Sequence, residues 1–232
     1  ARRHNPRRDR GDGAGAASHT PAMRSRLVYG PVPSRRFGLS LGVDLVPYKV
    51  CCYDCTYCHV GATTELTIGR QTFVDPDDVI RQVETALRAR PTTQQVTLSG
   101  SGEPTLYAPL AELRRGLRRI TRLPIVLLTN GGLLWDDEVA AAAADFDQIA
   151  PTLVAADAET FARIHRPAAA VEFAAMLDGL RRFCAAHGER VRLEVMLVAG
   201  QNDAAEQLAA LGRLVATLPV AAVDLNTVVR PP

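Results

Sequence analysis

The feature that most constrains the fold of this chain is a regular alternation of short apolar runs with amphipathic stretches, which begins at Leu41. The runs predict strands at 41–46, 95–98, 124–129, 149–154, 191–198 and 222–228. The stretches between them have apolar residues at helical spacing and predict helices at 76–90, 109–120, 136–144, 158–164, 171–187 and 204–218. The strands are nearly continuous in apolar residues, as in a parallel sheet buried on both faces. We therefore expect an α/β fold, either a parallel barrel or an open doubly wound sheet, with functional groups at the carboxyl ends of the strands.

Length and composition indicate one globular domain. The 232 residues suffice for one sizeable core, and 47% hydrophobic with 22% charged residues is ordinary for such a domain. No apolar run reaches the roughly 18–20 residues of a membrane-spanning helix, and no N-terminal segment resembles a secretory signal. We predict a cytoplasmic protein with no membrane partner. Because the chain stops just after the last predicted strand, we also expect a longer parent chain.

The N-terminus differs in composition from the rest. Residues 1–26 are rich in Arg, Gly, Ala and Pro without apolar periodicity, and they predict a disordered basic tail. This tail holds seven Arg against two Asp, which leaves 20 basic and 23 acidic residues in the predicted core domain, 27–232. The tail is either simply solvated or an arm that touches RNA. The slightly acidic core argues against a broad nucleic-acid-binding surface.

Four of the five cysteines lie within eight residues and predict a metal centre. Cys51, Cys55 and Cys58 form the pattern C-x3-C-x2-C directly after the first predicted strand. Thiolates select zinc, copper(I) and iron–sulfur clusters, and a structural zinc site needs four ligands. Three thiolates instead suit a cluster that keeps one iron open to another ligand. A zinc knuckle completed by His59 or Cys52 is the alternative.

Polar turns follow the second and third predicted strands. Gly100 and Gly102 allow close approach of the backbone to a ligand, and Glu103 can accept a hydrogen bond from an ammonium group. Asn130, which precedes two glycines, can reach a ribose or a carboxylate. Each segment taken alone also fits an ordinary turn.

Together these motifs resemble the radical S-adenosylmethionine (radical SAM) superfamily. The cysteine pattern has the aromatic Tyr57 before its last cysteine, and the Gly-Glu pair follows the next strand. Residues 29–36 (YGPVPSRR), 39–47 and 102–106 (GEPTL) are similar to radical enzymes related to wyosine synthases. The resemblance runs from about residue 29 to the C-terminus. It implies a partial (β/α)6 TIM-like barrel, in agreement with the six alternations.

The resemblance also implies roles for individual residues. Cys51, Cys55 and Cys58 would hold a 4Fe–4S cluster. S-adenosylmethionine would be contacted by Tyr57 near the adenine, by Gly102 and Glu103 at the methionine amine with Gly100 in the same turn, by Asn130 near the methionine or ribose, and by Thr152 and Asn202 at the nucleoside. Relatives often carry Ser-Leu-Asp on strand four, where this chain reads Thr-Leu-Val at 152–154.

The implied activity is reductive cleavage of S-adenosylmethionine to a 5′-deoxyadenosyl radical that acts on a further substrate. An electron donor such as a flavodoxin or ferredoxin is the implied partner, and the substrate can be a tRNA base, a peptide or a small molecule. Two readings compete with this one. The first is a zinc-binding or RNA-binding module, and the second is a doubly wound nucleotide-binding fold with residues 100–104 as a phosphate loop.

Overall fold

The computed structural model describes residues 26–34 and 38–229. Its main sheet has strands β1 (Val28–Ser34), β2 (Gly38–Val43), β5 (Gln95–Leu98), β6 (Ile125–Thr129), β7 (Gln148–Leu153), β8 (Arg192–Leu197) and β9 (Ala222–Thr227). Its helices are α1 (Pro76–Ala89), α2 (Leu110–Ile120), α3 (Asp137–Ala144), α4 (Ala158–His165), α5 (Phe173–His187) and α6 (Ala205–Val215). Apart from Arg26, the predicted basic tail lies outside the described residues.

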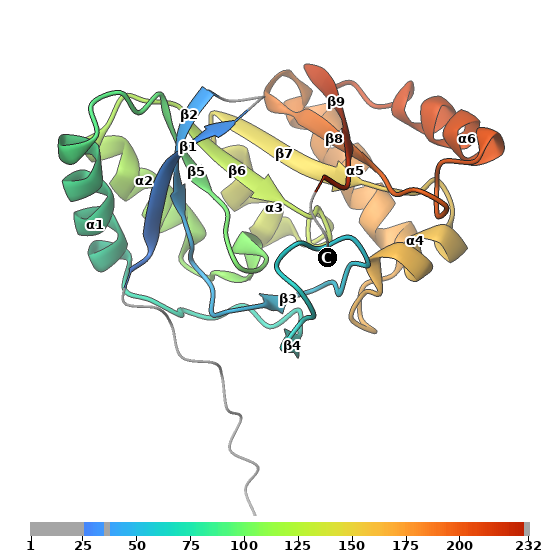
Figure 1. Ribbon diagram of the computed structural model, residues 1–232, viewed down its shortest axis with the longest axis horizontal. Coiled ribbons are helices and arrows are strands. Elements are labelled where there is room, and N and C mark those ends of the chain that lie inside the picture. Colours follow the sequence, from blue (N-terminus) through green and yellow to red (C-terminus); the bar gives the residue numbers. More distant parts are fainter. Residues whose placement is uncertain (1–25, 35–37, 230–232) are drawn as a thin grey trace, which may run out of the picture.

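The main sheet is a curled half-barrel, which confirms the predicted partial (β/α)6 architecture. In the described part of the chain its strand order is β1-β2-β5-β6-β7-β8-β9, and all neighbours are parallel except β1 and β2. The helices follow the strands in turn and flank the curved sheet (Figure 1). Each parallel strand therefore ends at the same edge, where β3 (Val50–Cys51) and β4 (Glu65–Leu66) form a small separate sheet.

Strand β1 was not predicted, and the first predicted strand is displaced. The sequence of β1, VYGPVPS, contains two prolines that lack a backbone N–H, and it has no alternating pattern. Such a sequence is tolerated at the edge of a sheet, where β1 lies. Strand β2 ends at Val43 rather than at residue 46, because the chain then turns toward the cysteine segment.

Local capping fixes the starts of several helices. Asp75, Asp136 and Asp157 each accept hydrogen bonds from backbone N–H groups in the first turn of α1, α3 and α4. At the partly exposed end of α2, the Arg114 and Arg118 guanidinium groups both pair with the carboxylate of Asp147, which ties α2 to the segment before β7. Within the described residues, no helix has the length and apolar composition that crossing a membrane requires.

The last two strands differ from the expected apolar pattern, because they alternate between polar and apolar residues. Arg192 and Asp224 form an ion pair across β8 and β9 with a distance of 2.7 Å between Nη2 and Oδ1. On the same face, Asn226 Nδ2 donates to Glu194 Oε1 at 2.9 Å. The intervening Leu193 on β8 is fully buried. The opposite face of β8 packs in the core, whereas the opposite face of β9 is exposed at Val223 and Leu225. The polar face of both strands lines the interior of the half-barrel.

Candidate metal and cofactor site

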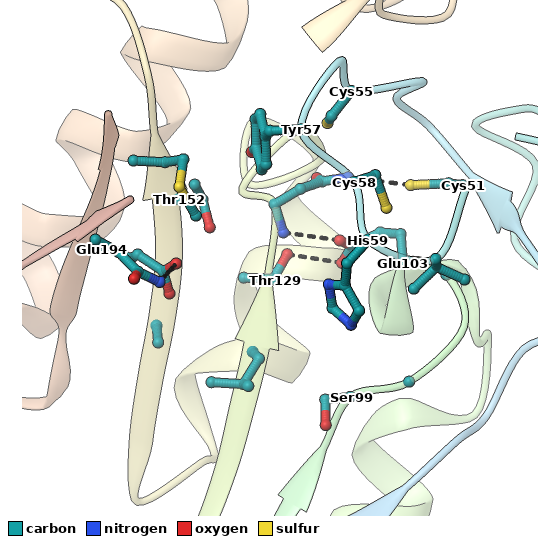
Figure 2. Close-up of a pocket in the computed structure, with 18 of the residues that line it drawn as sticks. Cys51, Cys55, Tyr57, Cys58, His59, Ser99, Glu103, Thr129, Thr152 and Glu194 are labelled. Carbon is teal, nitrogen blue, oxygen red and sulfur yellow. Dashed lines mark hydrogen bonds between the residues drawn. The ribbon is translucent and has the colours of Figure 1, made fainter. Parts of the chain in front are cut away.

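A cavity of about 390 Å³ lies at the carboxyl ends of the parallel strands. The cysteine segment forms one wall and the ends of β6, β7, β8 and β9 contribute to the other (Figure 2). Its size falls within the roughly 300–1,000 Å³ of small-molecule sites. This is the edge of the sheet at which the sequence predicted functional groups.

The structure separates the three predicted ligands from the other cysteines. Cys51, Cys55 and Cys58 line the cavity. Cys52 is fully buried in the core and does not line it, because successive residues of an extended chain point to opposite sides. Cys184 is buried within α5. Three thiols therefore face one space.

The cysteine segment has little regular structure and is held by long-range hydrogen bonds. Cys58 N donates to Cys55 O at 3.1 Å, which forms a tight turn between two of the thiols. Thr63 N donates to the Asp54 carboxylate at 2.8 Å and closes the loop. Asp54 N in turn donates to His165 O at 2.9 Å, at the end of α4. The position of the thiols thus depends on how this loop docks on α4.

Lys49 places a positive charge beside the thiols. Lys49 is almost fully buried, lines the cavity and donates from Nζ to Thr63 Oγ1 at 3.1 Å. Burial lowers the pKa of Lys49, but negative charge on Cys51 and Cys58 outweighs burial and raises it overall. Burial raises the pKa of the Cys55 thiol, and negative charge on Cys51 raises it further. A lysine so placed favours thiolates over thiols.

Glu103 is a buried carboxylate with four donors from the protein. Its Oε1 accepts from Thr105 N at 3.1 Å, Thr105 Oγ1 at 2.7 Å and Thr129 Oγ1 at 2.7 Å. Its Oε2 accepts from Asn130 N at 2.8 Å. Burial raises the pKa of Glu103, and these hydrogen bonds counteract that rise. The side chain thus joins β6 to the turn after β5. Three of the four donors share Oε1, and each carboxylate oxygen has two lone pairs, so Oε2, which accepts one bond, retains room for one more donor.

The glycines in that turn are required by close packing. A Cβ on Gly102 would lie 1.9 Å from Val50 O, and one on Gly100 would lie 2.3 Å from the Asp44 carboxyl carbon. Glu103 N donates to Val50 O at 3.1 Å. The turn therefore docks directly against the residue before Cys51, which brings two separately predicted motifs together.

Asn130 faces the cysteines. Its Oδ1 accepts from Gly132 N at 2.8 Å, and its Nδ2 lies 3.5 Å from Cys51 Sγ and 3.2 Å from Cys52 Sγ. Figure 2 labels Cys51 and Glu103, which Asn130 contacts through its side chain and its backbone N–H. Asn130 also lines the cavity. The sequence had placed it near the methionine or ribose, and it did not indicate a contact with a thiol.

Comparison with known families identifies this arrangement. Residues 45–212 match the Radical SAM superfamily, a span that includes all three cavity cysteines, Glu103 and Asn130. The chain belongs to the radical SAM superfamily. Enzymes of this superfamily use a 4Fe–4S cluster and S-adenosylmethionine and require a reductant, so the predicted class and cofactors are confirmed at the level of the family.

Sequence relatives cover most of the chain. A UPF0026 protein of Helicobacter pylori is 34% identical over 208 residues, which are 88% of this chain and 67% of the relative. A protein of Brachyspira hyodysenteriae named GTPase Obg is 33% identical over 208 residues, or 90% of this chain and 31% of the relative. A UPF0026 protein of Methanocaldococcus jannaschii is 31% identical and covered to 64%. The radical SAM chain thus spans between about a third and two thirds of these relatives.

Solved radical SAM structures share the fold. The structure of TYW1 with a lysine-pyruvate adduct superimposes with a TM-score of 0.58 at 17% identity, over 81% of this chain and 64% of that one. The structure of anSMEcpe with bound AdoMet gives a TM-score of 0.60 at 13% identity, over 83% and 52%. At these identities the likeness establishes the fold alone, and it confirms the predicted barrel.

The residues of the cavity fit an iron–sulfur cluster better than a single ion. Among the described residues, no group of three or more His, Cys, Asp or Glu side chains is close enough to hold one metal ion. A cluster of four irons and four sulfides is larger and takes its thiolates at wider separation. The three thiols that face the cavity, with Cys52 turned away, match a site of three thiolates. A zinc knuckle would have to use His59, which also lines the cavity, because Cys52 does not; membership of the radical SAM superfamily favours the cluster.

The remaining predicted cofactor residues divide into two groups. Tyr57 and Thr152 line the cavity, and Tyr57 Oη lies 3.2 Å from His165 Nε2. Asn202 is fully buried and lies outside the lining. Its amide donates to Val154 O at 2.7 Å and its Oδ1 accepts from Val198 N at 2.7 Å. Asn202 thus joins the ends of β7 and β8 and supports the wall that Thr152 and its neighbours form.

Sequence reasoning missed three charged or polar residues of the cavity wall, namely Lys49, Glu194 and Asn226. Lys49 is the only lysine of the chain, but its rarity alone did not indicate a role in the site. Glu194 interrupts an apolar strand and is nearly buried. A single carboxylate within an apolar strand could have indicated that Glu194 faces the site. Its pairing with Asn226 could not be predicted, because it depends on the register of β8 and β9.

Proposed function

We propose that Cys51, Cys55 and Cys58 hold the 4Fe–4S cluster and that the chain cleaves S-adenosylmethionine reductively. The observation that carries this proposal is the convergence of these three thiols, and not of Cys52, on one cavity. When bound, the cluster and its cofactor supply one-electron cleavage of a sulfonium bond and so a hydrogen-abstracting 5′-deoxyadenosyl radical. The protein has to orient the cofactor and exclude water from it.

The cofactor would lie between the turn after β5 and the ends of β6 and β7. Glu103 has acceptor capacity on Oε2 for the methionine ammonium, next to the backbone of Gly102. Tyr57 and Thr152, which both line the cavity, would contact the nucleoside. Asn202 would act on the nucleoside through the strand ends that it joins.

The substrate is a separate proposal. The sequence resemblance to wyosine-synthase-related enzymes favours a tRNA base. Two of the structural neighbours are SuiB bound to a precursor peptide and anSMEcpe bound to a peptide. A small molecule is equally compatible, since a probable GTP 3′,8-cyclase of Saccharolobus islandicus is 32% identical over 130 residues. We propose a flavodoxin or ferredoxin as reductant and a cytoplasmic location. Residues 27–232 are proposed as the radical SAM core.

The proposal is tested by anaerobic reconstitution of the full chain. Single Cys51→Ala, Cys55→Ala and Cys58→Ala variants should each lose the cluster, which is measured as iron and sulfide content and by EPR after reduction. The wild type should form 5′-deoxyadenosine from S-adenosylmethionine and dithionite. Cys52→Ser is the matched control, because it removes the neighbouring thiol that does not line the cavity. A wild-type chain that binds zinc but no iron–sulfur cluster would refute the proposal.

A further inference from the structure

The environment of Cys51 contains a donor whose orientation is fixed. The Asn130 amide can turn either its oxygen or its nitrogen toward the cysteines. Oδ1 accepts from Gly132 N at 2.8 Å and from the Cys52 thiol at 3.4 Å, so both of its lone pairs have donors and Nδ2 is the amide atom that donates toward Cys51. Nδ2 then lies 3.5 Å from Cys51 Sγ and 3.2 Å from Cys52 Sγ.

The backbone of Asn130 is fixed as well. Its N–H donates to Glu103 Oε2 at 2.8 Å, and the same carboxylate accepts from Thr129 Oγ1 at 2.7 Å. The glycine turn that follows packs so closely that a Cβ on Gly132 would lie 2.7 Å from the Tyr53 ring. An amide held by a buried carboxylate and a packed turn is preorganised and loses little entropy when it binds a charged sulfur.

We propose that Asn130 is a positioning residue that donates an N–H···S hydrogen bond to the cluster ligand Cys51 and thereby raises the reduction potential of the cluster. Reduction adds negative charge to the cluster and its thiolates, so a donor to sulfur stabilises the reduced state more than the oxidised state. This role rests on the proposed function, because it requires Cys51 to be a ligand of the cluster. It differs from a direct contact with the methionine or ribose.

The effect can be expressed as an equilibrium constant. A hydrogen bond typically contributes about 0.5–1.5 kcal/mol net, which is about a twofold to thirteenfold change in the constant for one-electron reduction. A tenfold change corresponds to about 59 mV for one electron. Asn130→Ala should therefore lower the potential by up to about that amount at unchanged cluster content.

The experiment is an EPR-monitored redox titration of the reconstituted full chain without S-adenosylmethionine. Asn130→Asp is the second variant, because its carboxylate can still accept from Gly132 N while it loses the donor and adds a negative charge near the thiolate. Its potential should lie below that of Asn130→Ala. Electron–nuclear double resonance should detect an exchangeable proton near the cluster in the wild type and not in Asn130→Asp.

Cys52→Ala resolves which sulfur matters. If the bond to Cys51 acts directly, Asn130→Ala lowers the potential by a similar amount in the Cys52→Ala background. A shift that disappears in that background, or an Asn130→Asp potential equal to or above that of the wild type, overturns the proposal. If the wild type assembles no 4Fe–4S cluster, the proposed function itself fails, and iron analysis separates that outcome from the first two.

Discussion

Replacement of Glu103 tests whether this buried carboxylate binds the cofactor or only supports the site. The side chain is 2% exposed and accepts four hydrogen bonds at 2.7–3.1 Å. Hydrogen bonds to charged groups contribute about 1.5–3 kcal/mol each, and they are not additive. Because Glu103→Ala leaves buried donors without an acceptor, we expect a loss of roughly 3–5 kcal/mol of unfolding free energy.

The same variant should keep its iron and lose cofactor affinity. The proposed protein ligands of the cluster are the three cysteines, so iron per folded chain should equal that of the wild type. Loss of a charge-assisted bond to the methionine ammonium costs about 1.5–3 kcal/mol, or about 10- to 150-fold in affinity. Formation of 5′-deoxyadenosine should slow accordingly.

The assay is a titration of the reconstituted cluster with S-adenosylmethionine, combined with urea unfolding of each variant. Thr105→Val is the matched control, since it removes one donor to Glu103 Oε1 but keeps the carboxylate. We expect it to lose about 1 kcal/mol of stability and to keep its affinity within about twofold. Equal affinities for wild type and folded Glu103→Ala would refute the assignment of Glu103 as the amine acceptor, whatever the loss of stability.

Three further predictions concern other parts of the chain. Cys52→Ser and Cys184→Ala should retain full iron and sulfide after reconstitution, because neither thiol lines the cavity; loss of cluster in either would show that the ligands are misassigned. Deletion of residues 1–22, which hold no predicted strand or motif residue, should leave cluster content and cofactor cleavage intact, as measured by iron analysis and 5′-deoxyadenosine yield; a loss of RNA binding alone would identify the tail as an arm. Burial lowers the pKa of His165 to about 3, whereas a histidine in the unfolded chain titrates near about 6.5. Between these pH values the unfolded state binds the extra proton, so the free energy of unfolding should fall as the pH falls from about 6.5 toward 3, by at most about 1.4 kcal/mol per pH unit. Urea unfolding of the apoprotein between pH 7 and 4 should show that decline and a shallower one in His165→Phe, and equal slopes would contradict the assignment.

Much of the fold followed from sequence because its signals are local. Helix caps such as Asp75 and the spacing of apolar residues act within one turn or strand, and they placed the six parallel strands and their helices in the right order. Strand β1 was not predicted, because its two prolines disfavour a strand in any local pattern. It is extended because it pairs with β2 at the edge of the sheet. The polar inner face of β8 and β9 likewise becomes clear only once the two strands are in register.

The sequence by itself determined which thiols form a C-x3-C-x2-C set, since residues three and four apart in a loop are close in any fold. Only the tertiary structure decided that Cys51 faces the cavity while Cys52 faces the core, because this depends on how the loop docks against α4. It also decided that Glu103 holds the backbone of Asn130, 27 positions away, and that the Asn130 amide meets a sulfur 79 positions away. Local propensity carries no information about contacts between residues so far apart in the sequence. These contacts form only when β5 and β6 end at the same edge of the sheet.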